Sequence, residues 1–256
     1  MDTTLANARS VNHPVVSRDQ WIADRKTLLA REKELTRLRD QVARERRALP
    51  WVRVDKNYVF DAPEGGRTLG ELFDGRRQLV VQHFMFAPGW DEGCKSCSFM
   101  ADHIDGANVH LAHRDVTLVV VSRAPLADIE RFRHRMGWKF KWLSSYGSDF
   151  NYDFGVSFTP EDMARGETYY NYGMKPFAQE EMPGISIFCS EGTGDIFHTY
   201  SAYERGVEVM MGTYNVLDLT PKGRDEDGLS FSMEWLRHHD RYETTQAVGS
   251  RCQGYA

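Results

Sequence analysis

Residues 79–99 read Leu79-Val-Val-Gln-His-Phe-Met-Phe-Ala-Pro-Gly-Trp-Asp-Glu-Gly-Cys-Lys-Ser-Cys-Ser-Phe99. The first eight are almost all apolar, which is typical of a strand covered on both faces of a sheet. Pro88-Gly89 ends the strand, and a helix is predicted from residue 98 to about residue 111. The Cys94-Lys95-Ser96-Cys97 dithiol therefore lies between a buried strand and a helix.

Two further apolar runs extend this pattern along the chain. A second buried strand is predicted over residues 116–121 and a third over residues 139–143, with a helix that begins at Pro125 between them. Two strand–helix–strand units in succession imply parallel pairing with right-handed crossovers. Residues 185–200 are predicted to form a hairpin that lies antiparallel on the same sheet. The fold class is therefore α/β, with a central mixed sheet flanked by helices.

The other segments divide the chain. Residues 51–60 alternate like a strand pair that turns at residues 55–57, and residues 202–217 predict a helix. Residues 148–181 are rich in Tyr, Phe, Asn and Gly, and we interpret them as an insertion with short helices before the last two core strands. We expect an N-terminal extension over residues 1–50, a core domain over 51–220 and a C-terminal extension over 221–256.

A long charged helix is predicted near the N-terminus. Ser17 occupies an N-cap position with Gln20 at capping-box spacing, and residues 18–47 contain no Gly or Pro. A narrow apolar stripe runs along this helix and consists of Trp21, Leu28, Leu35 and Val42. We expect the stripe to pack either on its own domain or on a second subunit. Because so long a helix extends beyond a compact domain, we favour a homodimer.

Composition restricts the class of protein. The 256 residues carry a formal net charge of -5, and 41% of them are hydrophobic, as in ordinary globular proteins. A mildly acidic chain provides no electrostatic footprint for nucleic acid or for an anionic membrane surface. The sequence contains no run of about 18 apolar residues and no apolar core behind a basic start, so we expect neither a membrane helix nor a secretory signal. A cytoplasmic protein is expected.

The spacing of the cysteines indicates redox chemistry. Of the four cysteines, Cys94 and Cys97 form a close pair, whereas Cys189 and Cys252 stand alone. The free N–H groups and the dipole at a helix N-terminus favour a thiolate, so Cys94 is the expected attacking thiol. Cys97, one turn deeper, is the expected resolving thiol. A structural zinc site needs four ligands and the chain has no second close pair, so no metal or other cofactor is expected.

Several blocks of the sequence resemble a known family. The block Phe84-Met-Phe-Ala-Pro-Gly-Trp-Asp-Glu-Gly-Cys-Lys-Ser-Cys-Ser-Phe99 is similar to the active-site segment of an uncharacterised thioredoxin-like family, a domain of unknown function labelled predicted dithiol-disulfide oxidoreductase. Its other blocks resemble Met136-Gly-Trp138, Ser144-Ser-Tyr-Gly-Ser-Asp-Phe-Asn151 and Trp235-Leu-Arg-His-His-Asp-Arg-Tyr242. The resemblance covers roughly residues 13–242. It implies a thioredoxin-like fold and a disulfide or thiol substrate, carried by a protein or a small molecule.

The wider thioredoxin superfamily implies a cis-proline that faces the dithiol. Pro183 matches that position, and a cis bond there would present the backbone of Met182 to a substrate. Thioredoxin itself has a tryptophan next to its first cysteine, whereas Trp90 lies four positions upstream of Cys94. We take Trp90, Met182 and Pro183 as the candidate substrate-binding residues. This difference from thioredoxin favours an enzyme with a narrow range of substrates over a general protein-disulfide reductase.

Two alternative functions stay open. Peroxiredoxins share the strand–cysteine–helix arrangement, but they place Thr three residues before the reactive cysteine and Pro farther upstream. Here Cys94 and Trp90 occupy those two positions. A thioredoxin-like scaffold can also act as a non-catalytic binding protein. Of the histidines, His198 is expected to be a packing residue, and His238-His239-Asp240 a polar network or a surface feature.

Overall fold

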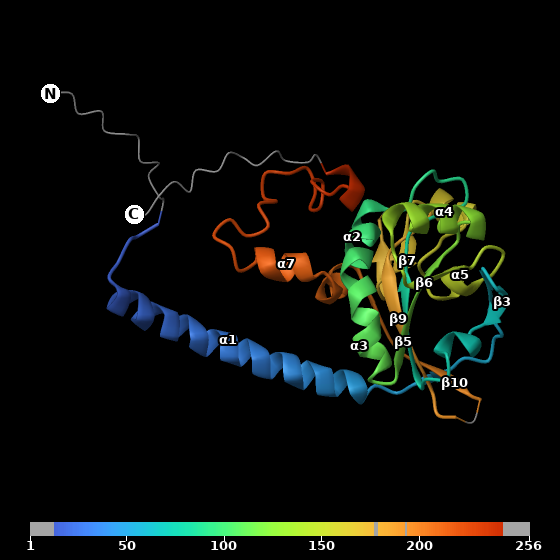
Figure 1. The fold of residues 1–256 in the computed structure, drawn as a ribbon, viewed down its shortest axis with the longest axis horizontal. Coiled ribbons are helices and arrows are strands. Elements are labelled where there is room, and N and C mark those ends of the chain that lie inside the picture. Colours follow the sequence, from blue (N-terminus) through green and yellow to red (C-terminus); the bar gives the residue numbers. More distant parts are fainter. Residues whose placement is uncertain (1–12, 177–178, 193, 243–256) are drawn as a thin grey trace. The chain divides into compact units, whose positions relative to one another are not determined.

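The computed structural model describes residues 13–176, 179–192 and 194–242 (Figure 1). Contacts within the chain divide it into two units, Met1–Leu49 and Pro50–Ala256. Among the described residues, no helix combines the length and the apolar character needed to cross a membrane.

The first unit contains the helix α1 (Arg18–Arg47), whose bounds agree with the prediction. Ser17 caps its N-terminus, because the Ser17 hydroxyl accepts a hydrogen bond of 3.2 Å from the backbone N–H of Gln20. The ion pair of Arg25 with Glu32, 2.7 Å long, adds modest stability. None of the helix residues is buried, and the side chains of the apolar stripe are 41–55% exposed. A partner for the stripe, and with it the homodimer, stays a prediction.

The second unit is built around an eight-stranded mixed sheet with the strand order β1-β10-β9-β4-β5-β6-β2-β3. The strands are β1 (Val52–Arg53), β2 (Val59–Ala62), β3 (Gly65–Thr68), β4 (Gln78–His83), β5 (Val116–Ser122), β6 (Lys141–Ser144), β9 (Gly184–Ser190) and β10 (Ile196–Tyr203). β4, β5 and β6 are parallel neighbours, and β9 and β10 form an antiparallel hairpin that pairs with β4 through β9. The predicted parallel pairing and the predicted hairpin are both confirmed.

Successive side chains of β5 point to opposite faces of the sheet, and a hydrophobic core lies on each face. Leu118 and Val120 point to a cluster completed by α2 (Lys95–Ile104) and α4 (Leu126–Met136). Val119 and Val121 point to a second cluster, which includes Phe150 of α5 (Phe150–Asp153). Figure 1 shows α2 running along one side of the sheet. The predicted central mixed sheet flanked by helices is therefore confirmed, together with the long N-terminal helix.

The strand pair predicted for residues 51–60 is wrong, because its two halves lie on opposite sides of the central strands β4 and β5. β1 pairs with β10, whereas β2 pairs with β3 and with β6. Alternation of apolar and polar residues predicts that each half is a strand, but it does not indicate which strand each half pairs with. Phe60 of β2 packs edge-on against Phe150 at 4.8 Å between ring centroids, so the core holds this half on the β6 side.

The helix predicted over residues 202–217 is wrong in its first half. β10 continues to Tyr203, and a 3-10 helix over Glu204–Met210 separates it from α7 (Gly212–Leu217). Glu204 has a φ of 47° and Met211 a ψ of 82°, and neither value fits an α-helix. The first residues of the segment instead extend the pairing of β10 with β9.

The insertion before β9 carries short helices, as predicted, and also a hairpin that was not predicted. They are α5, α6 (Pro160–Ala164) and a separate hairpin of β7 (Thr168–Tyr170) and β8 (Gly173–Lys175). Tyr170 packs edge-on against Tyr203 at 5.3 Å between ring centroids, so the hairpin lies beside the end of β10. After α7, the described part of the C-terminal extension, residues 221–242, is called the C-terminal segment. It contains a 3-10 turn, His239–Arg241.

The helix after the dithiol begins earlier than predicted, at Lys95 rather than at Ser98. A 3-10 turn over Asp105–Ala107 interrupts it before α3 (Asn108–Ala112), and another 3-10 turn, Glu71–Phe73, precedes β4. The earlier start affects the chemistry, because it brings both cysteines into the N-terminus of the helix.

Candidate active site

The dithiol occupies the N-terminus of α2. Cys94 is the N-cap residue, and Cys97 lies in the first turn. The backbone N–H of Cys94 donates to the carbonyl of Met85 at 3.0 Å, which ties the dithiol to the end of β4. Ser98 donates from its backbone N–H and from its hydroxyl to the carbonyl of Cys94, each at 2.9 Å. Cys94 therefore lies at the helix N-terminus, as predicted, while the roles of the two thiols stay predictions.

The two thiols have different surroundings. Cys97 is buried, with 2% of its surface exposed, and its sulfur accepts a hydrogen bond of 3.4 Å from the backbone N–H of Met85. Cys94 is partly exposed, and its sulfur lies 3.1 Å from the hydroxyl oxygen of Ser96. Both cysteines are free. Cys94 is therefore the more exposed of the two residues.

Hydrogen bonding separates the pKa values of the two thiols. The Cys97 thiol donates a hydrogen bond to the Cys94 sulfur, and this bond lowers the pKa of Cys94 to about 6. The Ser96 hydroxyl and the backbone N–H groups of Ser96 and Cys97 lower it in the same direction. Burial of Cys94 opposes the shift. The same bond and burial raise the pKa of Cys97 well above its ordinary value. At neutral pH Cys94 is therefore a thiolate, and Cys97 keeps its proton.

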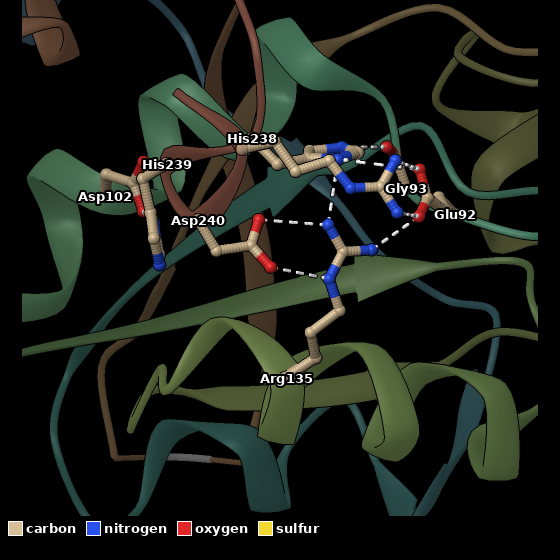
Figure 2. A network of polar contacts seen from close by, with 8 residues as sticks. Glu92, Gly93, Asp102, Arg135, His238, His239 and Asp240 are labelled. Carbon is tan, nitrogen blue, oxygen red and sulfur yellow. Dashed lines mark hydrogen bonds and ion pairs between the residues drawn. The ribbon is translucent and has the colours of Figure 1, made fainter. Parts of the chain in front are cut away.

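The C-terminal segment holds the loop before Cys94 (Figure 2). The buried ring of His238 donates from Nε2 to the carbonyl of Gly93 at 2.9 Å. Gly93 has no room for a side chain, because a Cβ there would lie 2.5 Å from the Phe84 ring and 2.8 Å from the Phe132 ring. The backbone next to Cys94 is therefore fixed from both sides.

An ion-pair network surrounds this contact. Figure 2 shows the Arg135 guanidinium between two carboxylates, bonded to Glu92 at 2.5 Å and to Asp240 at 2.8 Å. Beside it, His239 lies 2.7 Å from a carboxylate oxygen of Asp102. The His-His-Asp motif is therefore a polar network that joins the C-terminal segment to the dithiol loop and to α2.

A buried carboxyl group lies two residues before the candidate proline. The Glu181 side chain is 1% exposed, and it accepts hydrogen bonds from Arg123 at 2.5 Å and from the Ser157 hydroxyl at 2.8 Å. Burial raises the pKa of Glu181 to about 7, although Arg123 opposes the shift. The charge of Glu181 also raises the pKa of Cys97, so this acid contributes to the electrostatic surroundings of the dithiol.

Sequence reasoning missed Arg135 and Glu181 as parts of the site. A single Arg or Glu forms no pattern of its own, and Arg135 is 43 positions from Glu92. The His-His-Asp motif was the available signal, but nothing in its spacing indicates which loop it contacts.

Pro183 has a different conformation from the one expected. The described residues contain no cis peptide bond, so the bond from Met182 to Pro183 is trans. The N–H of Met182 donates to the carbonyl of Val156 at 2.8 Å, and the carbonyl of Pro183 accepts from the Tyr170 hydroxyl at 2.6 Å. The cis bond that the superfamily implies is therefore not present, and the Met182 N–H is bonded within the protein.

A cavity of about 220 Å³ adjoins the dithiol. Ser96, Cys97 and Pro183 are among the residues that line it. Trp90 packs instead on the core cluster beneath α2 and α4, and Met182 packs on the cluster that joins the insertion to β10. Of the three candidate substrate-binding residues, Pro183 is the one in this cavity.

Within the described ranges, no three His, Cys, Asp or Glu side chains are grouped to hold a metal ion. His198 bonds the Ser201 hydroxyl at 2.7 Å and packs edge-on against Phe154 at 5.3 Å between ring centroids. Cys189 is a free thiol in β9, and Cys252 lies outside the described residues. His198 therefore fits the packing role expected for it.

Comparison with known proteins assigns the chain to a family. No curated protein matches it. Among solved structures, the peroxidoxin BcpB of Mycobacterium tuberculosis is 13% identical, with 62% of this chain and 88% of that chain covered and a TM-score of 0.44. A thiol:disulfide interchange protein from Bacteroides sp. is 12% identical, with 70% of this chain and 97% of that chain covered and a TM-score of 0.41. The model of a family described as bacterial protein of unknown function (DUF899) matches residues 10–242, and the chain therefore belongs to this family.

Proposed function

We propose that the protein is a thiol–disulfide oxidoreductase that acts through Cys94 and Cys97. One observation carries the proposal. The sulfur of the partly exposed residue Cys94, at the N-terminus of α2, has a pKa of about 6, and the buried thiol of Cys97 donates a hydrogen bond to it. The thiolate is the form that attacks disulfides, and a second thiol next to it can resolve the product.

The proposed reaction consists of two exchanges. The Cys94 thiolate attacks one sulfur of a substrate disulfide, the substrate S–S bond breaks, and the released thiolate takes up a proton from water. Cys97 then loses its proton and attacks the Cys94 sulfur, which releases the second substrate thiolate and leaves a disulfide between Cys94 and Cys97. Two electrons pass from the protein dithiol to the substrate, and the reverse sequence oxidises a substrate dithiol.

The other assignments belong to the same proposal. Pro183, which lines the cavity beside Cys97, contacts the bound substrate. Trp90 and Met182 stay candidate substrate-binding residues, although neither lines that cavity. A cytoplasmic location, where thiols are kept reduced, is part of the proposal. The exposed stripe of α1 supports a homodimer.

Two substitutions and mass spectrometry test the proposal. In Cys97→Ser the reaction stops after the first exchange, so a mixed disulfide should accumulate on Cys94. In Cys94→Ser no mixed disulfide should form. Cys189→Ser changes a free thiol in β9 and is the matched control, which should react like the parent protein.

Two outcomes would replace the proposal. If peroxide converts Cys97 to a sulfenic acid while Cys94 reacts slowly, the protein is a peroxiredoxin-like peroxidase. If neither thiol reacts until the protein unfolds, the pair is structural and the chain is a non-catalytic binding protein.

A further inference from the structure

The cavity beside the dithiol has a wall made largely of apolar and thioether side chains. Met100 of α2, Val207 and Met211 are each at most 4% exposed, and Met233 of the C-terminal segment lines the cavity with them. Thioether side chains are polarisable and adapt to irregular apolar groups. The wall therefore favours an apolar ligand.

The charged residues that line the cavity already have charged partners. Glu208 pairs with Arg205 at 3.0 Å and with Arg224 at 3.1 Å. Glu204 pairs with Lys175 at 3.1 Å. A charged ligand would have to break these pairs or lose its hydration against methionine side chains, and both changes are unfavourable. The electrostatics therefore disfavour a charged ligand.

The cavity is within reach of the reactive thiolate. Ser96 lines the cavity, and its hydroxyl oxygen lies 3.1 Å from the Cys94 sulfur. An organic group attached to the sulfur that Cys94 attacks can therefore lie in the cavity. Its volume of about 220 Å³ is below the range of about 300–1,000 Å³ that is usual for pockets of drug-sized ligands. The cavity is suited to a short organic group.

We propose that this cavity binds the organic group of the substrate, and that the substrate is a small, uncharged disulfide or thiol. The inference rests on the proposed function, because it names the substrate class for the exchange at Cys94. In the first exchange the organic group enters the cavity while its sulfur bonds to Cys94. The second exchange, in which Cys97 attacks Cys94, releases this group as a thiolate.

The test compares three disulfides in single turnovers of the reduced full-length protein. Bis(2-hydroxyethyl) disulfide is uncharged, cystamine is cationic, and oxidised glutathione is anionic. Each rate constant is divided by the rate constant of the same disulfide with dithiothreitol, which removes differences in intrinsic reactivity. On this scale the uncharged disulfide should react about tenfold faster than the other two, equivalent to about 1.4 kcal/mol.

Two matched pairs of variants locate the effect. Ser232→Trp places a large ring at the cavity from an exposed position, and Ser230→Trp places the same ring on an exposed residue that does not line the cavity. Val207→Phe fills the interior, and Val209→Phe, at a position 77% exposed in the same 3-10 helix, is its control. The first variant of each pair should slow the uncharged disulfide about tenfold. The pH midpoint of Cys94 alkylation should be the same in all four.

The outcomes separate the inference from the proposed function. If no disulfide reacts with the parent protein, the proposed function fails. If all three react at similar normalised rates, or if Ser232→Trp reacts like Ser230→Trp, exchange at Cys94 stands and the cavity assignment is overturned. Ser232→Trp decides the test if Val207→Phe does not fold, because Ser232 is exposed.

Discussion

The helix α1 and the dithiol segment, defined as residues 90–104, form helical structure in different ways. α1 has 30 residues, none of them buried, and its start follows from the Ser17 cap. α2, in the dithiol segment, has 10 residues, and most of them are buried. The first helix depends on interactions along its own chain, whereas the second depends on packing.

This difference matters because the proposed chemistry is confined to the packed helix. Hydrogen bonds from other elements hold the dithiol segment in place. Gln82 donates to the carbonyl of Cys97 at 3.3 Å, and His238 donates to the carbonyl of Gly93 at 2.9 Å. We therefore expect changes around the dithiol segment to alter both folding and thiol reactivity, and changes in α1 to alter neither.

Replacing Gly93 by Ala should have the largest effect. The added Cβ would lie 2.5 Å from the Phe84 ring and 2.8 Å from the Phe132 ring, so the core or the loop must shift. Overpacking of this kind lowers the free energy of unfolding by about 3 kcal/mol. Gly106→Ala, where nothing lies within 4 Å of an added Cβ, is the control and should be neutral or slightly stabilising. Urea unfolding measures both, and equal stabilities would contradict the packing argument.

Removal of the Cys97 thiol should have the next largest effect, which is a change in the reactivity of Cys94. In the parent protein, alkylation of Cys94 should have its midpoint near pH 6, because the thiolate is the reactive form and is lost as the pH falls through the pKa. Cys97→Ala removes the main hydrogen-bond donor, so the midpoint should move toward the value of about 8.5 for a free thiol. Cys97→Ser keeps a hydroxyl donor and should move the midpoint less.

Alkylation rates measured across the pH range by mass spectrometry check this prediction. A midpoint that stays near pH 6 in Cys97→Ala would mean that the helix N-terminus and Ser96 are sufficient to lower the pKa of Cys94.

Replacing His238 should have a smaller effect on the same thiol. His238→Leu removes the N–H that bonds Gly93, which should lower the free energy of unfolding by about 1 kcal/mol. The midpoint of Cys94 alkylation should rise, because the loop that presents the N-cap residue is no longer held. His238→Gln keeps a donor and should restore part of the difference, and His239→Ala, at an exposed position, should behave like the parent. An unchanged midpoint in His238→Leu would limit this contact to a structural role.

Changes on α1 should have the smallest effect on the dithiol. Leu28→Gln combined with Leu35→Gln alters two exposed side chains, so the free energy of unfolding of the second unit should change by no more than about 0.5 kcal/mol. Alkylation of Cys94 should be unchanged. Light scattering should show loss of the proposed dimer, because the stripe no longer packs on a second subunit. A parent protein that is monomeric at micromolar concentration would refute the dimer and leave the helix in place.

Features with a short-range pattern were predictable. The apolar run before the dithiol and the run over residues 116–121 predict buried strands. A strand covered on both faces of the sheet has apolar side chains on both faces, so its sequence is continuously apolar. The bounds of α1 follow from one cap and a long stretch without Gly or Pro. Strand partners were not predictable in the same way. Residues 51–60 alternate as strands do, but their two halves pair on opposite sides of the central strands β4 and β5.

The position of Cys94 at a helix N-terminus could be inferred from the order of strand, turn and dithiol along the chain. Its surroundings could not, because hydrogen bonds and burial depend on distances in space rather than on separation along the chain. His238 holds the dithiol loop from 145 positions away, and Met233 comes from the same distant segment to line the cavity. The local sequence therefore predicted the two thiols and contains the neighbouring donors, Ser96 and Cys97, that lower the pKa of Cys94. Tertiary packing decided the burial of Cys97, the contact that holds the dithiol loop, and the wall that a substrate would meet.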